Sequence, residues 1–154
     1  MKNVLIVLLA AALLLMPACS AAPEADRDVD LDALAEELLD GDLFGEELDL
    51  ADEGIAQKLY GIDGADVFRL YVGSGATASE LALLRFEAEE DAQAALLLAQ
   101  ERVAAQKESF ASYLPGEVEK LEEAIVERYG HHVVVCVSEG DADEILSKYF
   151  RAGD

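Results

Sequence analysis

Hydrophobic residues recur three or four positions apart in four stretches of the chain, which is the spacing of one buried helix face. The helices expected on this basis cover residues 29–39, 52–60, 89–110 and 141–150. Asp28 or Asp30 would cap the first of them, and Gly41 and Gly61 would end the first and the second. The stretch 89–110 holds no Gly or Pro and is rich in Ala, Leu, Glu and Gln, which favours one long helix.

Four other stretches alternate between apolar and polar residues or form short apolar runs, which favours strands. They cover residues 65–72, 80–88, 124–129 and 132–138. In the first of them, Phe68, Leu70 and Val72 share one side. Gly130 and His131 separate the last two stretches and are typical of a tight hairpin.

Together these elements predict an α+β fold in the order ααββαββα. We expect one antiparallel four-stranded sheet whose helices pack mainly on one face, in a single domain over residues 28–154. If the second face stays open, Leu81 and Leu83 would point outward. They would then mark a partner surface, because contiguous exposed apolar patches are typical of such surfaces.

The N-terminus is typical of a lipoprotein export signal. After a positively charged start, an apolar run over residues 4–16 is followed by Ala18 and then Cys19. The run is shorter than the roughly 20 residues of a membrane-spanning helix. We therefore expect residues 1–18 to be a cleaved signal peptide and Cys19 to carry the lipid. Pro17 is unusual in such a box, and the alternatives are a plain secretory signal cut elsewhere or an uncleaved short anchor.

Residues 19–27 would then comprise the lipidated cysteine and a short tether. The segment 20–27 reaches at most roughly 26–29 Å when fully extended. We therefore expect the domain at the outer face of the cytoplasmic membrane, attached through the lipid on Cys19.

The chain is strongly acidic, with 33 Asp and Glu against 11 Lys and Arg and a formal net charge of −22. Such a field repels nucleic-acid phosphates, anionic lipid head groups and anionic wall polymers, so we expect no nucleic-acid partner. Basic peptides, cations or the positively charged face of a membrane or exported protein remain as partners. The oligomeric state is left open.

Few residues suggest chemistry. Cys136 lies in an apolar run, so with Cys19 acylated we expect a buried, inert thiol and no disulfide. The acidic run 26–32 lacks the Gly of a calcium loop and is better explained by helix capping, so no metal or other cofactor is expected. His131 and His132 are adjacent, which on a strand sends their side chains to opposite faces.

A partner or ligand surface is expected where the scarce basic and aromatic residues and a Gly-rich connection fall. The candidate residues are Tyr60, Gly73, Ser74, Gly75, Lys107, Phe110 and Tyr113. For Lys107 the alternative is a solvated helix face or local ion pairing. For the Gly-rich connection it is an ordinary hairpin loop, since no G-x-S-x-G motif surrounds the serine.

Several short motifs follow one another along the predicted mature domain. They are Val29-Asp30-Leu31 with Leu38, Leu59 to Ile62, Tyr71 to Thr77, Gln106 to Phe110 with Tyr113, Glu119 to Leu121, Val133 to Val137, and Tyr149-Phe150. Their succession resembles a family of small lipoproteins, mainly from Gram-positive bacteria, that is defined only as a domain of unknown function. The resemblance implies a surface-anchored protein and implies no activity, substrate or cofactor.

We therefore expect a lipid-anchored extracytoplasmic binding or accessory protein. The alternative is a cell-envelope enzyme of the hydrolase type, with a nucleophile or metal converging near Ser74, His131 or His132. A third interpretation is a structural envelope component, which abundant self-association would distinguish. A deep pocket holding those groups would favour the enzyme, whereas a flat face or shallow groove would favour binding.

Overall fold

The computed structural model describes residues 28–151. The predicted signal peptide, Cys19 and the tether lie outside these residues. Within them the chain forms an α+β fold with five α-helices, one short π-helix and a single antiparallel sheet of five strands in the order β1-β2-β3-β5-β4. No helix in this part of the chain is long and apolar enough to cross a membrane.

The strands are short and the helices vary widely in length. The strands are β1 (Asp49–Leu50), β2 (Val67–Val72), β3 (Glu80–Arg85), β4 (Ile125–Tyr129) and β5 (His132–Val137). The helices are α2 (Leu31–Asp40), α3 (Glu53–Tyr60), α4 (Glu89–Tyr113), α5 (Gly116–Glu122), α6 (Asp143–Leu146) and the π-helix η2 (Ser147–Arg151). The predicted C-terminal helix is thus divided between α6 and η2.

The predicted sheet of four strands is corrected to five. β1 pairs antiparallel with the end of β2, with Asp49 opposite Val72 and Leu50 opposite Tyr71. β1 has only two residues, and both are exposed. It is therefore too short to show the alternation of apolar and polar residues by which a strand is predicted from a sequence. The other four strands form where the apolar patterns predicted them.

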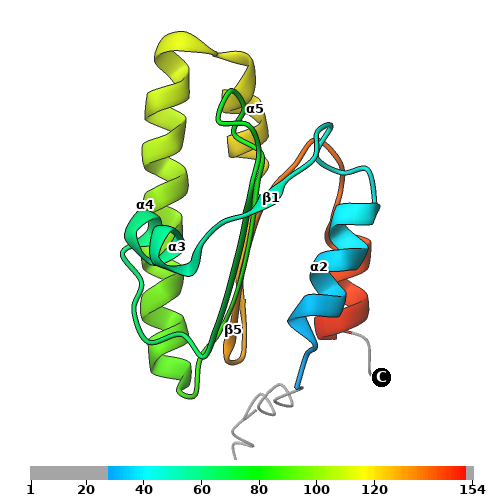
Figure 1. The fold of residues 1–154 in the computed structure, drawn as a ribbon, viewed down its shortest axis with the longest axis vertical. Helices are drawn as coiled ribbons and strands as arrows, with labels where there is room; N and C mark the ends of the chain where they lie inside the picture. The colour runs from blue at the N-terminus through cyan, green and yellow to red at the C-terminus, as the bar shows by residue number, and fades with distance from the viewer. Residues whose placement is uncertain (1–27, 152–154) are drawn as a thin grey trace, which may run out of the picture.

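Helices cover both faces of the sheet, so packing mainly on one face is not confirmed (Figure 1). α3, α4 and α5 lie on one side, and α2 with the C-terminal pair α6 and η2 lies on the other. Leu81 and Leu83 point toward the second side and are fully buried, in a cluster with Leu34 and Leu38 of α2. The condition under which Leu81 and Leu83 would mark an exposed partner surface is therefore not met, because α2 and α6 cover them.

Local signals set two of the helix boundaries as predicted, whereas α4 runs three residues past its predicted end at Phe110. The Asp30 carboxylate accepts hydrogen bonds from the backbone N–H groups of Asp32 and Ala33 at 3.1 and 3.0 Å, so it caps α2. Gly61 ends α3 in the left-handed conformation, with φ of 65°. The acidic run at the start of the domain therefore supplies a helix cap.

The domain has two distinct ends. Asp28 lies beside Arg85 and the β4–β5 hairpin, with 3.2 Å between its Oδ1 and the Arg85 Nη1; we call this the hairpin end. The β2–β3 loop (residues 73–79) and α5 lie at the opposite end (Figure 1). α4 is about 37 Å long, against about 20 Å for β3, so its last turns project past the sheet. We call residues 107–116 the distal tip.

Candidate functional site

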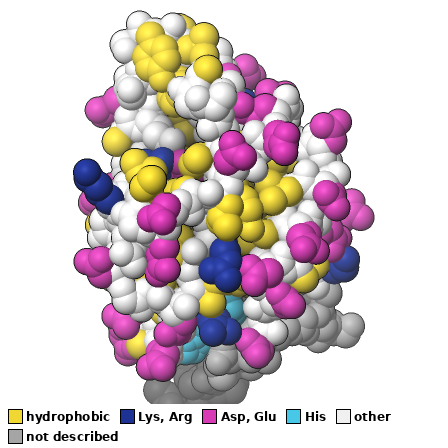
Figure 2. Space-filling view, in the orientation of Figure 1, with side chains coloured by type: hydrophobic (Ala, Val, Ile, Leu, Met, Phe, Trp, Pro, Cys, Tyr) yellow, Lys and Arg dark blue, Asp and Glu magenta, His cyan; other side chains and the backbone are white. Residues whose placement is uncertain are grey.

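The distal tip carries exposed hydrophobic side chains. Phe110 is buried, and its ring centroid lies 5.1 Å from that of Tyr113, which is 59% exposed. Leu114, at the end of α4, is 39% exposed. Figure 2 shows hydrophobic side chains gathered at this end, where Figure 1 places the connection from α4 to α5. An aromatic ring supported from beneath by a buried ring is a rigid contact element.

Lys107 ties the tip together. Its Nζ lies 3.1 Å from Glu122 Oε1, which joins α4 to α5. The structure thus contains the local ion pairing that is the alternative for Lys107 in the sequence. Lys107 therefore holds α4 to α5 at the tip, and Glu122 partly neutralises its positive charge.

The Gly-rich β2–β3 loop wraps around a carboxylate from another segment. Glu46 accepts hydrogen bonds from the Ser74 N–H at 3.2 Å, from the Ser74 hydroxyl at 3.3 Å and from the Thr77 hydroxyl. These bonds, Thr77 first, hold the pKa of Glu46 below its ordinary value. A Cβ on Gly73 would come within 2.5–2.9 Å of the same carboxylate, so glycine permits the close approach.

The loop is also fixed to α5. The Ala78 N–H donates to Glu117 Oε2 at 2.8 Å. Gly73, Ser74 and Gly75 therefore belong to the same end of the molecule as the distal tip, although they form a separate loop beside it. The structure thus gathers most of the predicted surface residues at one end.

Tyr60 does not belong to that surface. It is 3% exposed, and its hydroxyl donates to Glu80 Oε1 in the core. Burial, followed by the Glu80 carboxylate, raises the pKa of Tyr60 well above its ordinary value. The prediction that Tyr60 contacts a partner is corrected, because α3 turns this side chain toward the sheet and α4.

Tyr60 is one member of a buried polar network that the sequence pattern does not predict. Glu80, at the start of β3, is 1% exposed and is bonded by Arg102 through Nε at 2.9 Å and through Nη2. Gln106 donates from Nε2 to the same carboxylate at 3.4 Å. Burial opposes the charge of Arg102, but the hydrogen bond to Glu80 raises its pKa. Two features of the sequence are consistent with this network. A single carboxylate begins an otherwise apolar strand, and Arg102 and Gln106 lie one turn apart on α4.

A second buried contact joins a hydroxyl and an amine. Lys120 Nζ donates to Ser79 Oγ at 3.2 Å and lies 3.1 Å from Glu117 and 3.3 Å from Glu139. An ion-paired ammonium has no lone pair with which to accept a serine proton, and Ser79 is buried. The contact therefore holds α5 to β3 and to the segment after β5.

The groups needed for the hydrolase alternative lie at opposite ends. Ser74 is in the β2–β3 loop, whereas His132 stands opposite Arg85 at the hairpin end. The length of β3, about 20 Å, separates them. His131, in the hairpin turn, places Nδ1 3.2 Å from the Phe86 carbonyl oxygen. Ser74 therefore forms no nucleophile–base pair with either histidine.

Cys136 is buried as predicted, and burial raises the pKa of its thiol to about 11. Within residues 28–151, no three His, Cys, Asp or Glu side chains are grouped so as to hold a metal ion.

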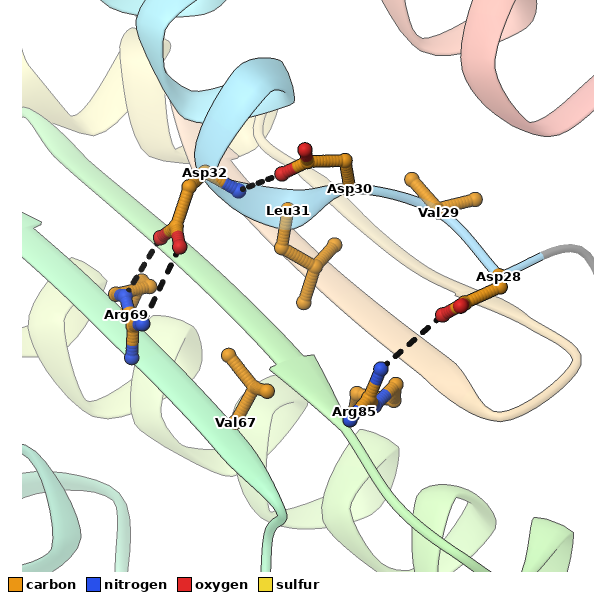
Figure 3. Close-up of a pocket in the computed structure, with 8 residues that line it drawn as sticks. All are labelled: Asp28, Val29, Asp30, Leu31, Asp32, Val67, Arg69 and Arg85. Atoms are coloured by element: carbon orange, nitrogen blue, oxygen red, sulfur yellow. Dashed lines mark hydrogen bonds and ion pairs between the residues drawn. The ribbon is translucent and has the colours of Figure 1, made fainter.

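A cavity of about 280 Å³ lies where α2 begins, and Figure 3 shows its lining. Arg69 reaches Asp32 with 2.8 Å between Nε and Oδ1, and Arg85 reaches Asp28. Both guanidinium groups are thus paired with carboxylates at the start of α2, Asp32 in its first turn and Asp28 just before it. The two ion pairs hold the start of α2 against the sheet, and the apolar side chains of Leu31 and Val67 also line the cavity.

A family model described as a domain of unknown function, DUF4358, matches residues 42–138. No curated protein matches the chain, and no solved structure matches it. The matched range holds the whole sheet and α3, α4 and α5. α2, α6 and η2, which cover the second face, lie outside it.

Proposed function

Because the chain belongs to the DUF4358 family, whose function is unknown, we propose a role from its own geometry. The protein is a lipid-anchored extracytoplasmic binding module, attached through Cys19, that docks a membrane or exported protein through its distal tip. One observation carries this proposal: the exposed aromatic tip lies at the end opposite to the point where residue 28 enters the domain.

This arrangement suits a tethered receptor or accessory protein. A lipid on Cys19 would hold the hairpin end toward the membrane, and α4 would present Tyr113 and Leu114 away from it. The polar groups of the domain support binding rather than catalysis. Ser79, Lys120, Glu80 and Arg102 each serve contacts between elements.

Charge defines the chemistry of the partner. Glu108 of α4 and Glu119 of α5 are exposed, and the chain as a whole has a net charge of −22. The partner is therefore a protein face with an apolar socket for the Tyr113 ring and a basic rim. Electrostatic complementarity of this kind speeds encounter and selects the partner.

Site-specific crosslinking in the native cell tests the proposal. A photoreactive amino acid at position 113 should yield one dominant protein adduct, identified by mass spectrometry, whereas the same group at position 131 should not yield it. Tyr113→Glu should abolish capture from a crosslinker at position 114, because burying a carboxylate in an apolar socket is costly. Leu97→Glu is the matched control, since Leu97 is similarly exposed on the middle of α4.

The anchor is tested in the same cells. Cys19→Ala should release the protein from the membrane fraction, stop incorporation of labelled fatty acid and remove the adduct. Equal capture by the Tyr113→Glu and Leu97→Glu variants would contradict docking through the tip. Membrane retention of the Cys19→Ala protein would contradict the lipid anchor independently.

A further inference from the structure

One edge of the sheet ends in a five-residue strand. The strand order places β1 and β4 at the two edges. β1 has only two residues, and the chain continues from it into α3. β4 pairs with β5 along its whole length, and among residues 28–151 no further strand pairs with its other side.

The register shows which backbone groups face outward. Tyr129 stands opposite His132 across a two-residue turn, which makes this pair a hydrogen-bonded one. Alternation along the ladder then directs the N–H and C=O groups of Glu127 toward β5 and those of Val126 and Arg128 away from it. The free edge therefore offers two backbone donors and two backbone acceptors at the spacing of an added strand.

The charged side chains of β4 are held above and below this edge. Arg128 lies 3.6 Å from Glu89 at the start of α4 and donates to the Gly130 carbonyl oxygen at 2.6 Å. Glu127 accepts from Arg151 of η2 at 2.8 Å. Each of these side chains is therefore tied to a neighbouring element on its own face of the sheet.

Carboxylates lie beyond the Ile125 end of the strand. Two depressions of about 340 and 350 Å³ meet there and share Glu123, Ser138 and Glu139 in their linings. The acidic residues that line one or both are Glu117, Glu119, Glu123, Glu139, Asp141 and Asp143. The single lysine among them, Lys120, is buried and ion-paired. A chain that follows β4 past Ile125 therefore enters a negative field.

From these observations we infer that β4 is a docking edge for an extended, basic segment of a partner protein, which adds to the sheet as a sixth strand. Backbone hydrogen bonds would supply affinity, and the carboxylates beyond Ile125 would select basic side chains. A second copy of this chain is disfavoured as the occupant, because each copy has a net charge of −22. The inference does not depend on the distal tip, which lies on other elements.

Calorimetry with the full-length protein and a synthetic probe tests the inference. The probe is a blocked peptide of about seven alternating lysine and valine residues, long enough to pair with β4. A copy N-methylated at every residue has no backbone N–H to donate to the edge and should bind about tenfold more weakly or worse. A copy with glutamate in place of lysine should not bind measurably.

Protein variants provide the reciprocal test. Val126→Pro removes an outward N–H without removing a ladder bond, and it should weaken peptide binding about tenfold or more. Val126→Ala keeps the N–H with a similar loss of packing and should bind the peptide like the unmodified protein. Hydrogen exchange should slow at Val126 and Arg128 when the peptide is added, and Tyr113→Glu should leave peptide affinity unchanged.

Three outcomes would overturn the inference. Equal affinity for the methylated and unmethylated peptides would show attraction by charge alone, whether or not Val126→Pro folds. Unchanged exchange at Val126 and Arg128 would place the peptide elsewhere. A dimer in sedimentation that Val126→Pro disperses would assign the edge to a second copy.

Discussion

The two faces of the sheet are held by polar contacts of opposite character. On the α4 face the Glu80 carboxylate lies inside the core and is bonded by Arg102, Tyr60 and Gln106. On the α2 face the core is apolar, and the ion pairs between Asp32 and Arg69 and between Asp28 and Arg85 lie at its exposed margin. The first face lies within the family match, and the helices of the second lie outside it.

Burial decides how strongly each of these polar contacts affects stability. Removing one partner of a buried pair leaves an uncompensated charge in a medium that cannot solvate it. An exposed pair loses little, because water replaces the missing partner. We therefore expect the α4 face to be sensitive to polar substitutions and the α2 face to be sensitive to apolar ones.

The largest effect is expected from Glu80→Gln. It leaves the mostly buried guanidinium of Arg102 (14% exposed) without its counter-charge, and it should lower the free energy of unfolding by about 3–5 kcal/mol. Urea denaturation followed by circular dichroism would measure the loss.

An apolar replacement of the pair provides the control. Glu80→Leu combined with Arg102→Met removes both charges, and the double variant should be more stable than Glu80→Gln alone. If Glu80→Gln costs less than about 1 kcal/mol, Glu80 is solvated and the contrast between the faces fails.

Leu34→Ala tests the other side of the comparison. Leu34 is fully buried between α2 and the sheet, and its truncation should cost about 3 kcal/mol through lost burial and the remaining cavity. Leu39→Ala, on the same helix but only partly buried, is the matched control and should cost less than about 1 kcal/mol. Equal losses for the two variants in urea would mean that α2 is not packed as described.

Local patterns predicted much of the fold. The spacing of Leu31, Leu34 and Leu38 predicted α2, and Asp30 and Gly61 act as helix boundaries. Local patterns do not predict that helices bury Leu81 and Leu83. Their burial depends on α2 and α6, which come from opposite ends of the domain, and periodicity records which residues are apolar but not which distant element covers them.

The candidate site was predicted unevenly for a related reason. Phe110 and Tyr113 were identified because aromatic residues are scarce, and the structure places them at the distal tip. Tyr60 was selected on the same ground, yet its hydroxyl is satisfied by Glu80, 20 positions away in sequence. Nothing local distinguishes a Tyr that contacts solvent from one that donates to a buried carboxylate.

The smallest effect is expected from the ion pair between Asp32 and Arg69. Asp32 lies in the first turn of α2, where Asp32→Asn also weakens a favourable interaction with the helix dipole, so a double-mutant cycle with Arg69→Met is needed to isolate the pair. Both side chains are substantially exposed, and their coupling should be below about 1 kcal/mol. Because solvent ions screen an exposed pair, the coupling should fall further when urea titrations are repeated at high salt. A salt-independent coupling above about 2 kcal/mol would mean that the Asp32–Arg69 contact is effectively dry, and that charge contributes to the α2 face as it does to the α4 face.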